Sequence, residues 1–164
     1  MDRRKRKTQK GITAVFYQLL KEKSYEEISV SQICQIADIN RGTFYLHFID
    51  KDDLLEKSIA DEMQRLVEYC EQNGETDNQK KLEKTFEYIT EHREKLKRML
   101  NADKQGFFTQ FQIDYLLEQL TGQSHLTSLF FAHGIVGLLE YYLLNDISKI
   151  EISQELEKIT QLLR

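Results

Sequence analysis

Residues 39–48, INRGTFYLHF, hold several groups that could do chemistry: a guanidinium, a hydroxyl, a phenol and an imidazole. Such groups donate hydrogen bonds to phosphate oxygens and base edges, so the pattern is typical of a surface that binds nucleic acid. Catalysis is the competing interpretation of the histidine. The four histidines of the chain, however, show neither metal-ligand spacing nor a neighbouring nucleophile elbow. We expect no enzymatic activity, no metal and no cofactor.

A helix over residues 41–48 would sort these side chains by face. If Phe44 points inward, Phe48 lies beside it one turn later. The other side chains then point outward or to one flank, and they are Gly42, Thr43, Tyr45, Leu46 and His47. Arg41 suits a guanine edge and Leu46 suits a thymine methyl. The alternative is that the outward phenol and aliphatic side chain pack against another helix of the same chain.

The elements that must hold this helix carry their own local signals. Ser29 and Gln32 form a capping box, which predicts a short helix over residues 30–36. Its inward positions are Ile33, Ile36 and Ala37. Residues 37–40, ADIN, then form a tight turn in which Asn40 caps the next helix. A helix, a four-residue turn and a second helix make a helix-turn-helix, whose second helix enters the groove of DNA.

The rest of the chain is also expected to be helical, because it has no proline and only seven glycines. Apolar residues recur at spacings of three and four over residues 8–23. Asp50 caps a fourth helix that runs from Lys51 to about Glu71, followed by a loop at residues 72–78. Further helices are expected near residues 82–89, 96–100, 107–120, 125–145 and 152–163. The fold class is therefore all-α, with about nine helices.

The charge of the chain is unevenly distributed. Residues 1–51 carry a net charge of +4, whereas residues 52–164 carry −8. A basic head on an acidic body predicts an anionic partner for the head alone. The run RRKRK at residues 3–7 fits that partner, or is a solvated and disordered arm.

The location expected from the sequence is the cytoplasm, with no membrane partner. The basic start is followed by polar residues, so no secretory signal is expected. Residues 129–144 are apolar but shorter than a spanning helix, and they contain His133 and Glu140. We expect a buried helix there. Cys34 and Cys70 are expected to be reduced core thiols.

Residues 28–55, ISVSQICQIADINRGTFYLHFIDKDDLL, resemble the DNA-binding domain of the TetR family of bacterial regulators. The shared pattern is a small polar residue opening helix two, an alanine and a β-branched residue in the turn, an aromatic-Tyr-x-His-Phe recognition helix, and Lys-x-x-Leu-Leu opening helix four. The resemblance covers roughly residues 6–66. It implies an N-terminal three-helix domain, joined through a long fourth helix to a helical C-terminal domain over residues 67–164.

The resemblance also implies roles for single residues. Contacts to bases or the groove fall to Arg41, Gly42 and Leu46, and phosphate contacts to Thr43, Tyr45, His47 and Lys51. Ser31 and Gln32 occupy helix-two positions that touch DNA in some members. The chain departs from the family at Lys23-Ser24, where a glycine is usual, and at Val30-Ser31, where many members have Thr or Arg. We expect a weaker phosphate grip there, with the basic arm compensating.

The C-terminal half is similar to a branch of the family that includes activators of dihydroxyacetone kinase operons. The similarity covers residues 130–159, with Tyr142 where the branch often has Trp, and Asp146 where it often has Gly. In the family this domain usually dimerises through its last two helices and binds an effector within its body. An unknown small molecule or protein is thus the implied effector.

Residues for these two roles are proposed from spacing. Gly134 and Gly137 are three apart and let two backbones approach closely, which suits a subunit seam. The expected dimer residues are His133, Gly134, Gly137, Glu140, Leu156 and Ile159. His133 and Glu140 could instead line a pocket or lie satisfied at a wet edge. The expected pocket residues are Phe107, Phe111, Tyr115 and Tyr141. An aromatic stripe of this kind is also typical of plain core.

The sequence therefore predicts a homodimeric transcriptional regulator that binds a palindromic double-stranded operator. Repression is the commoner role in the family, and the C-terminal similarity leaves activation open. The alternative is a helical protein-interaction module of the same fold that binds a protein partner instead of DNA.

Overall fold

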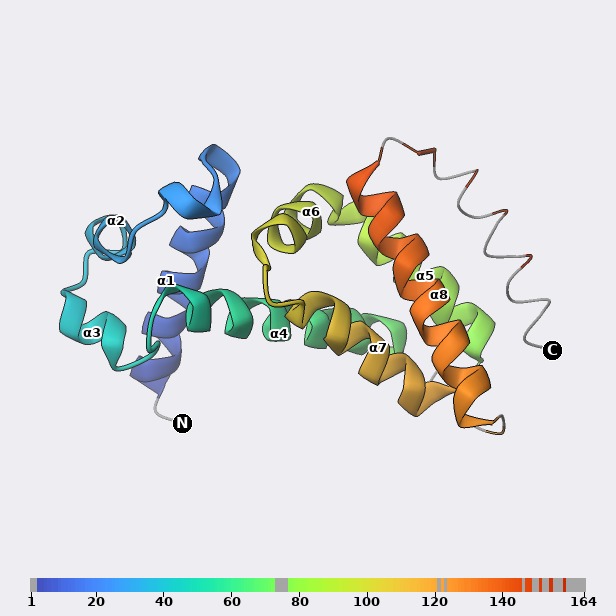
Figure 1. Cartoon of the computed structure of the whole chain (residues 1–164). Helices are drawn as coiled ribbons and strands as arrows, with labels where there is room; N and C mark the ends of the chain where they lie inside the picture. The colour runs from blue at the N-terminus through green and yellow to red at the C-terminus, as the bar shows by residue number, and fades with distance from the viewer. Residues whose placement is uncertain are drawn as a thin grey trace.

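In the computed structural model, the part of the chain that is described is built from helices only (Figure 1). The structure describes residues 3–72, 77–120, 122, 124–145, 147, 148, 151, 154 and 158. The helices are α1 (Arg3–Glu22), the short 3-10 helix η1 (Tyr25–Glu27), α2 (Val30–Ile36), α3 (Arg41–Tyr45), α4 (Lys51–Cys70), α5 (Asn78–Glu91), α6 (Arg93–Ala102), α7 (Phe107–Gln119) and α8 (His125–Leu144). The all-α fold class is confirmed.

The helices form two lobes joined by α4. Figure 1 shows α1, α2 and α3 gathered around the start of α4, which then runs into a second lobe with α5 to α8. The N-terminal lobe closes over aromatic and aliphatic side chains that are fully buried, among them Ile12, Phe16, Ile33, Phe44 and Leu54. Buried side chains of α4, such as Ile59 and Met63, continue the same core into the second lobe. The main core therefore runs continuously along α4, and a smaller separate cluster lies between α7 and α8, made of Ile113, Ala132 and Val136.

In the second lobe, α4 packs against α5 and α7, and α7 packs against α8. Helix α8 is long and apolar enough to cross a membrane by length and composition. One side of it nevertheless lies in the protein core, with Ser128, Ala132, Ile135, Val136, Leu139, Tyr142 and Leu143 buried. The expected buried helix is thus correct for one face of α8 only.

Helix α6 holds the two lobes together through long cationic side chains. Arg98 Nη1 donates to the carbonyl of Leu20 at the end of α1, at 2.9 Å. Lys95 Nζ lies 4.2 Å from the ring centroid of Tyr17. Just after α6, Lys104 Nζ lies 2.5 Å from Glu26 in η1. The orientation of the N-terminal lobe therefore depends on α6.

A buried carboxylate lies at the same junction. Glu62 of α4 is only 1% exposed. Its Oε2 accepts from Lys95 Nζ at 2.5 Å and from Arg65 Nη1 at 2.8 Å, and its Oε1 accepts from the Tyr88 hydroxyl at 3.1 Å. Two cations and a phenol thus satisfy a charge that would otherwise be costly to bury.

Three expectations about the elements need correction. Helix α1 begins at Arg3, not near Thr8, so the basic run is helical and not a disordered arm. Regular α-helix in α3 ends at Tyr45, although the Phe48 amide still bonds to the Phe44 carbonyl at 3.0 Å. Ile36 was expected inward but is 49% exposed, because it lies in the last turn of a seven-residue helix. The expected helix at residues 152–163 falls outside the described residues.

Candidate nucleic-acid interface

Helix α2 begins at the capping box expected from the sequence. The Ser29 hydroxyl accepts from the Gln32 amide at 3.3 Å, and Gln32 Oε1 accepts from the Ser29 amide at 3.0 Å. The side-chain carbonyl oxygen of Gln32 is therefore used in the cap, and its side-chain N–H groups stay available to other partners. Ser31, one position earlier, is exposed.

A Schellman motif ends α2 and sets the angle of the turn. Asp38 has a φ of 51°, in the left-handed region that short polar side chains tolerate. The Ile39 amide donates to the Cys34 carbonyl at 3.0 Å, and the Asp38 amide to the Gln35 carbonyl at 3.4 Å. These two bonds define the motif. They satisfy the last carbonyls of α2 and direct the chain towards α3.

Helix α3 is fixed at both ends and along its inner face. Asn40 Oδ1 accepts from the Thr43 amide at 2.7 Å and caps the helix. Phe44 and Phe48 are 0% and 2% exposed, with ring centroids 5.6 Å apart. Because both rings are anchored in the core, the opposite face of α3 is held at a defined place on the surface.

That opposite face is open to solvent. Tyr45 is 55% exposed and Leu46 is 72% exposed, so neither side chain is buried against another of the described helices. Gly42 is exposed as well, and a Cβ there would meet only the flexible Asn40 side chain, at 3.2 Å. Ile49, at 78%, extends the apolar surface beyond the helix, and sequence reasoning missed it. In the sequence, the only signal for this exposed position is that an isoleucine stands between the core residue Phe48 and the cap residue Asp50.

Arg41 and Ser31 lie together across the turn. The Arg41 guanidinium donates to the Ser31 hydroxyl, so the start of α3 is tied to the start of α2. Both side chains are exposed. Since a guanidinium has five N–H donors, most of them stay available to a ligand.

His47 and Thr43 lie half-buried on the flank of α3. Burial lowers the pKa of the His47 imidazole, and the positive charge of Lys5 in α1 lowers that pKa further. Both effects favour the neutral imidazole in the free protein. The effect of Lys5 also shows that the start of α1 and the end of the recognition helix share one side of the lobe.

Lys51 is positioned differently from the other expected phosphate ligands. Its Nζ donates to the carbonyls of Tyr25 and Ile28 at 2.8 and 2.9 Å, and lies 4.0 Å from the Tyr25 ring centroid. Burial lowers the pKa of this amine. At least two of its three N–H groups thus hold the link between α1 and α2, which leaves one for a phosphate.

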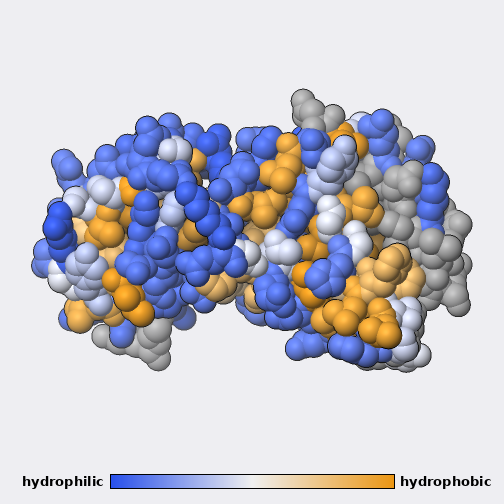
Figure 2. All heavy atoms as spheres, in the orientation of Figure 1, coloured by the Kyte–Doolittle hydropathy of each residue, from blue (hydrophilic) through white to orange (hydrophobic). Residues whose placement is uncertain are grey.

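The residues expected at a subunit interface lie on the free face of α8. His133, Gly134 and Gly137 are exposed, and a Cβ on either glycine would meet no atom of the described residues within 4 Å. The same face carries large exposed apolar side chains, which are Leu126, Phe130, Tyr141 and Leu144. On the view in Figure 2, apolar atoms gather over the lobe that holds α7 and α8. Glu140 turns back to α7, where it accepts from the Thr109 hydroxyl. Leu156 and Ile159 lie outside the described residues.

The four expected pocket residues are not brought together. Phe107 and Phe111 pack partly buried against the main core, and the Tyr115 hydroxyl donates to Glu71 at 3.5 Å, with burial raising the pKa of this phenol to about 12. Tyr141 is 56% exposed on the free face of α8. Leu139 and Leu143, not Tyr141, take the inward positions of that helix.

A capped, outward-facing second helix behind a Schellman turn defines the N-terminal lobe as a helix-turn-helix DNA-binding domain. The sequence model described as "Bacterial regulatory proteins, tetR family" matches residues 12–57, which contain this motif. The N-terminal domain of the chain therefore belongs to the TetR family.

Two relatives match the same region. The HTH-type dhaKLM operon transcriptional activator DhaS of Lactococcus lactis subsp. lactis (strain IL1403) is 38% identical over 60 residues, which are 37% of this chain and 32% of that protein. The uncharacterized HTH-type transcriptional regulator YxbF of Bacillus subtilis (strain 168) is 31% identical over 70 residues, 42% of this chain and 18% of that protein. The matches thus span a third or less of these relatives' length.

Two solved structures share the fold over nearly the whole chain. Dihydroxyacetone kinase operon activator DhaS superimposes with a TM-score of 0.66 at 24% identity, covering 95% of this chain and 93% of that one. The reduced form of E. coli NemR superimposes with a TM-score of 0.53 at 18% identity and the same coverage. At these identities the likeness concerns the fold, which includes the C-terminal lobe.

Proposed function

We propose that the chain is a dimeric transcriptional regulator that places α3 in the major groove of a palindromic operator. The observation that carries this is the exposure of Tyr45 and Leu46 on a helix whose other face is locked by Phe44 and Phe48. A phenol and a leucine held in water are unfavourable for a free protein and suit a surface that is covered in the complex. The match to the TetR family supports the same conclusion.

In this proposal the side chains divide into two sets. Arg41 and Leu46 read base edges, and Gly42 lets the backbone approach the groove. Phosphates are held by Thr43, Tyr45, His47 and the remaining N–H of Lys51, with Ser31 and Gln32 at the start of α2. The Ser31 hydroxyl also positions the Arg41 guanidinium.

Dimerisation is assigned to the free face of α8. Phe130 is 76% exposed there, and the backbone at Gly134 and Gly137 lies open to a second helix. A two-fold axis along this face would place two recognition helices on successive turns of the groove, about 34–36 Å apart or a multiple of it.

Effector control and the sign of regulation are further parts of the proposal. An effector in the C-terminal lobe would act by favouring one spacing of the recognition helices. Repression is the commoner role in the family, whereas DhaS is by name an activator. A reporter gene placed under the operator distinguishes repression from activation. Loss of the regulator raises expression of the reporter if the chain is a repressor and lowers it if the chain is an activator. No catalytic role is proposed, and the site of action is the cytoplasm, where bacterial DNA lies.

Binding to duplex DNA across a salt series tests the proposal. For the purified chain, log K should fall linearly with log salt, by about 0.9 for each phosphate contacted. Arg41→Ala should relax preference at particular base pairs of an operator selected in vitro from random sequence, whereas Tyr45→Phe should weaken all sequences alike. A flat or absent salt response would refute DNA binding and favour a protein-interaction module.

A further inference from the structure

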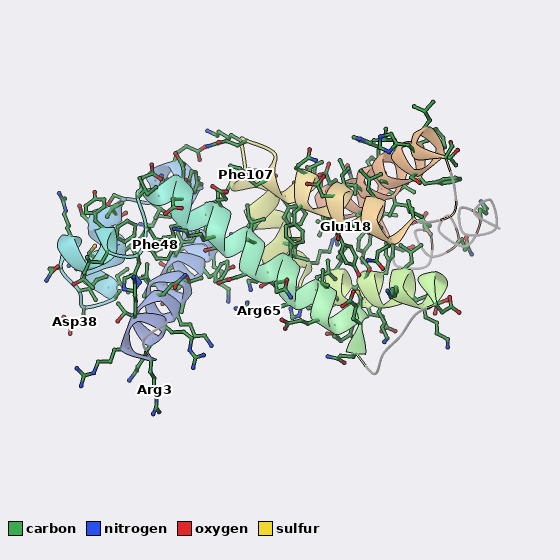
Figure 3. All side chains as sticks on the ribbon, turned by 90° about the horizontal axis from the view of Figure 1, so that it is seen from below. Arg3, Asp38, Phe48, Arg65, Phe107 and Glu118 are labelled. Carbon is green, nitrogen blue, oxygen red and sulfur yellow. The ribbon has the colours of Figure 1, made fainter. Side chains whose placement is uncertain are left out.

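The strongest concentration of charge in the structure lies outside the helix-turn-helix. The first turns of α1 carry five consecutive cations, Arg3, Arg4, Lys5, Arg6 and Lys7, and all of them are exposed. Figure 3 shows Arg3 at the far tip of α1, with nitrogen-ended side chains extending away from the lobe. Because the backbone here is helical, these charges are displayed on an ordered scaffold.

This arrangement is unfavourable for the free helix. The N-terminus of a helix carries a partial positive charge, which favours acidic side chains there, and the first turn of α1 has none. Arg3 also repels Arg6 and Lys7, which lie three and four positions later on neighbouring parts of the surface. Among the described residues, no acidic side chain is paired with Arg3, Lys5, Arg6 or Lys7. A local conflict of this kind is typical of a functional surface.

The basic turns lie on the same side of the lobe as the recognition helix. Lys5 falls two turns before Ile12 and on the same face, so it projects past the edge of the core. There its charge acts on the imidazole of His47, next to the buried Phe48. Figure 1 agrees, since the start of α1 and α3 lie at the same lower edge of the lobe.

We propose that residues 3–10 of α1 are a second DNA-binding element, a cationic prong that contacts phosphates beside the segment read by α3. This rests on the proposed function. The prong adds affinity without sequence preference, because Arg and Lys on a helix tip meet the backbone of the duplex and not a base edge. A bound polyanion also removes the repulsion within the prong. A membrane surface fits less well, since the outward positions of these turns carry no large apolar side chain to insert.

The double variant Arg3→Gln plus Arg6→Gln tests the prong. Loss of two phosphate contacts should reduce the salt slope of log K by about 1.8, so the fall in affinity between 50 and 200 mM salt becomes about 12-fold smaller than for the wild type. The loss should be equal on the in vitro selected operator and on a scrambled duplex of the same length, which leaves their affinity ratio unchanged.

Lys21→Gln plus Lys23→Gln is the matched control. It removes the same charge at the other end of α1, where Lys21 lies in the last turn and Lys23 directly follows the helix. Lys21 lies eighteen residues from Arg3, about 27 Å along the axis. Its salt slope should stay at the wild-type value. The prong variant should melt at or slightly above the wild-type temperature in the absence of DNA, because it relieves charge repulsion. Weaker binding then cannot be ascribed to unfolding.

Each outcome separates the two proposals. If the wild type binds DNA with a steep salt slope but the prong variant keeps that slope, the prong is refuted and the proposed function stands. If only the operator loses affinity, the prong reads sequence and the assignment to phosphates is wrong. A wild type that shows no salt-dependent DNA binding overturns both.

Discussion

Lys51 is given two roles, a structural contact with backbone carbonyls and a proposed contact with a DNA phosphate. A single substitution can distinguish them. Its Nζ bridges the carbonyls of Tyr25 and Ile28, at 2.8 and 2.9 Å, and lies over the Tyr25 ring. Both carbonyls belong to the link between α1 and α2, whereas Lys51 is the first residue of α4. The Lys51 side chain therefore stabilises the helix-turn-helix in the free protein, before any DNA is bound.

The perturbation is Lys51→Met, which keeps the methylene stem and removes the donors. A hydrogen bond from a charged donor contributes about 1.5–3 kcal/mol, and the contact with the ring about 0.5–1 kcal/mol. Removing the amine also removes the cost of desolvating it, seen in its lowered pKa, and water can reach the partly buried carbonyls. We expect a net loss of about 2 kcal/mol. For a chain of this size the melting temperature should fall by about 4–8 °C.

The assay is thermal or urea unfolding of the full chain without DNA, with Lys21→Met as the control. Lys21 is exposed, so its variant should stay within about 0.5 kcal/mol of the wild type. The urea m-value should be unchanged, because the surface exposed on unfolding is the same. If Lys51→Met unfolds like the wild type and only loses DNA affinity, its carbonyl contacts contribute nothing and Lys51 is a phosphate ligand alone.

Three further predictions concern other parts of the molecule. The pKa of His47 is lowered in the free protein, whereas DNA phosphates favour the charged imidazole. Affinity should therefore rise as pH falls towards the lowered pKa of the free imidazole, by at most about tenfold per pH unit, and fluorescence anisotropy should show no such rise for His47→Gln. Glu62→Gln should lower the free energy of unfolding measured with urea by about 2 kcal/mol, since one charged contact is lost while Lys95 and Arg65, 28% and 50% exposed, regain water. An unchanged urea midpoint would mean that the buried charge is energetically neutral. Gly137→Leu should separate the proposed dimer without unfolding the subunit, because a Cβ there meets no described atom within 4 Å; sedimentation of an intact dimer would place the interface elsewhere.

The caps of the N-terminal lobe could be predicted because their partners lie close in sequence. Ser29, Asn40 and Asp50 each accept from an amide three positions later, as their residue types predict. The position of the turn between α2 and α3 could also be predicted, but not the left-handed residue that forms it. Its left-handed residue is Asp38, and an aspartate gives a weaker signal for that conformation than a glycine would.

Contacts between distant elements could not be read from the sequence. Glu62 follows Asp61 in a polar stretch, yet only Glu62 is buried, because Lys95 and Tyr88 approach it from α6 and α5. Lys51 has partners 26 and 23 positions away. The helical start at Arg3 was missed for a different reason: a run of cations has no apolar period and no cap.

Helix α1 connects the proposed prong with the junction between the lobes. Its last turns are held by α6, through Lys95 over Tyr17 and Arg98 on the Leu20 carbonyl, while its first turn carries Arg3 at the DNA side. The 20 residues of the helix span about 30 Å, so a rotation of about 10° at the α6 end moves the other end by roughly 5 Å. A shift of that size is enough to take both the prong and the recognition helix out of register with the duplex. A ligand or substitution that moves α6 is therefore expected to change DNA affinity, although α6 itself lies at the opposite end of α1 from the DNA.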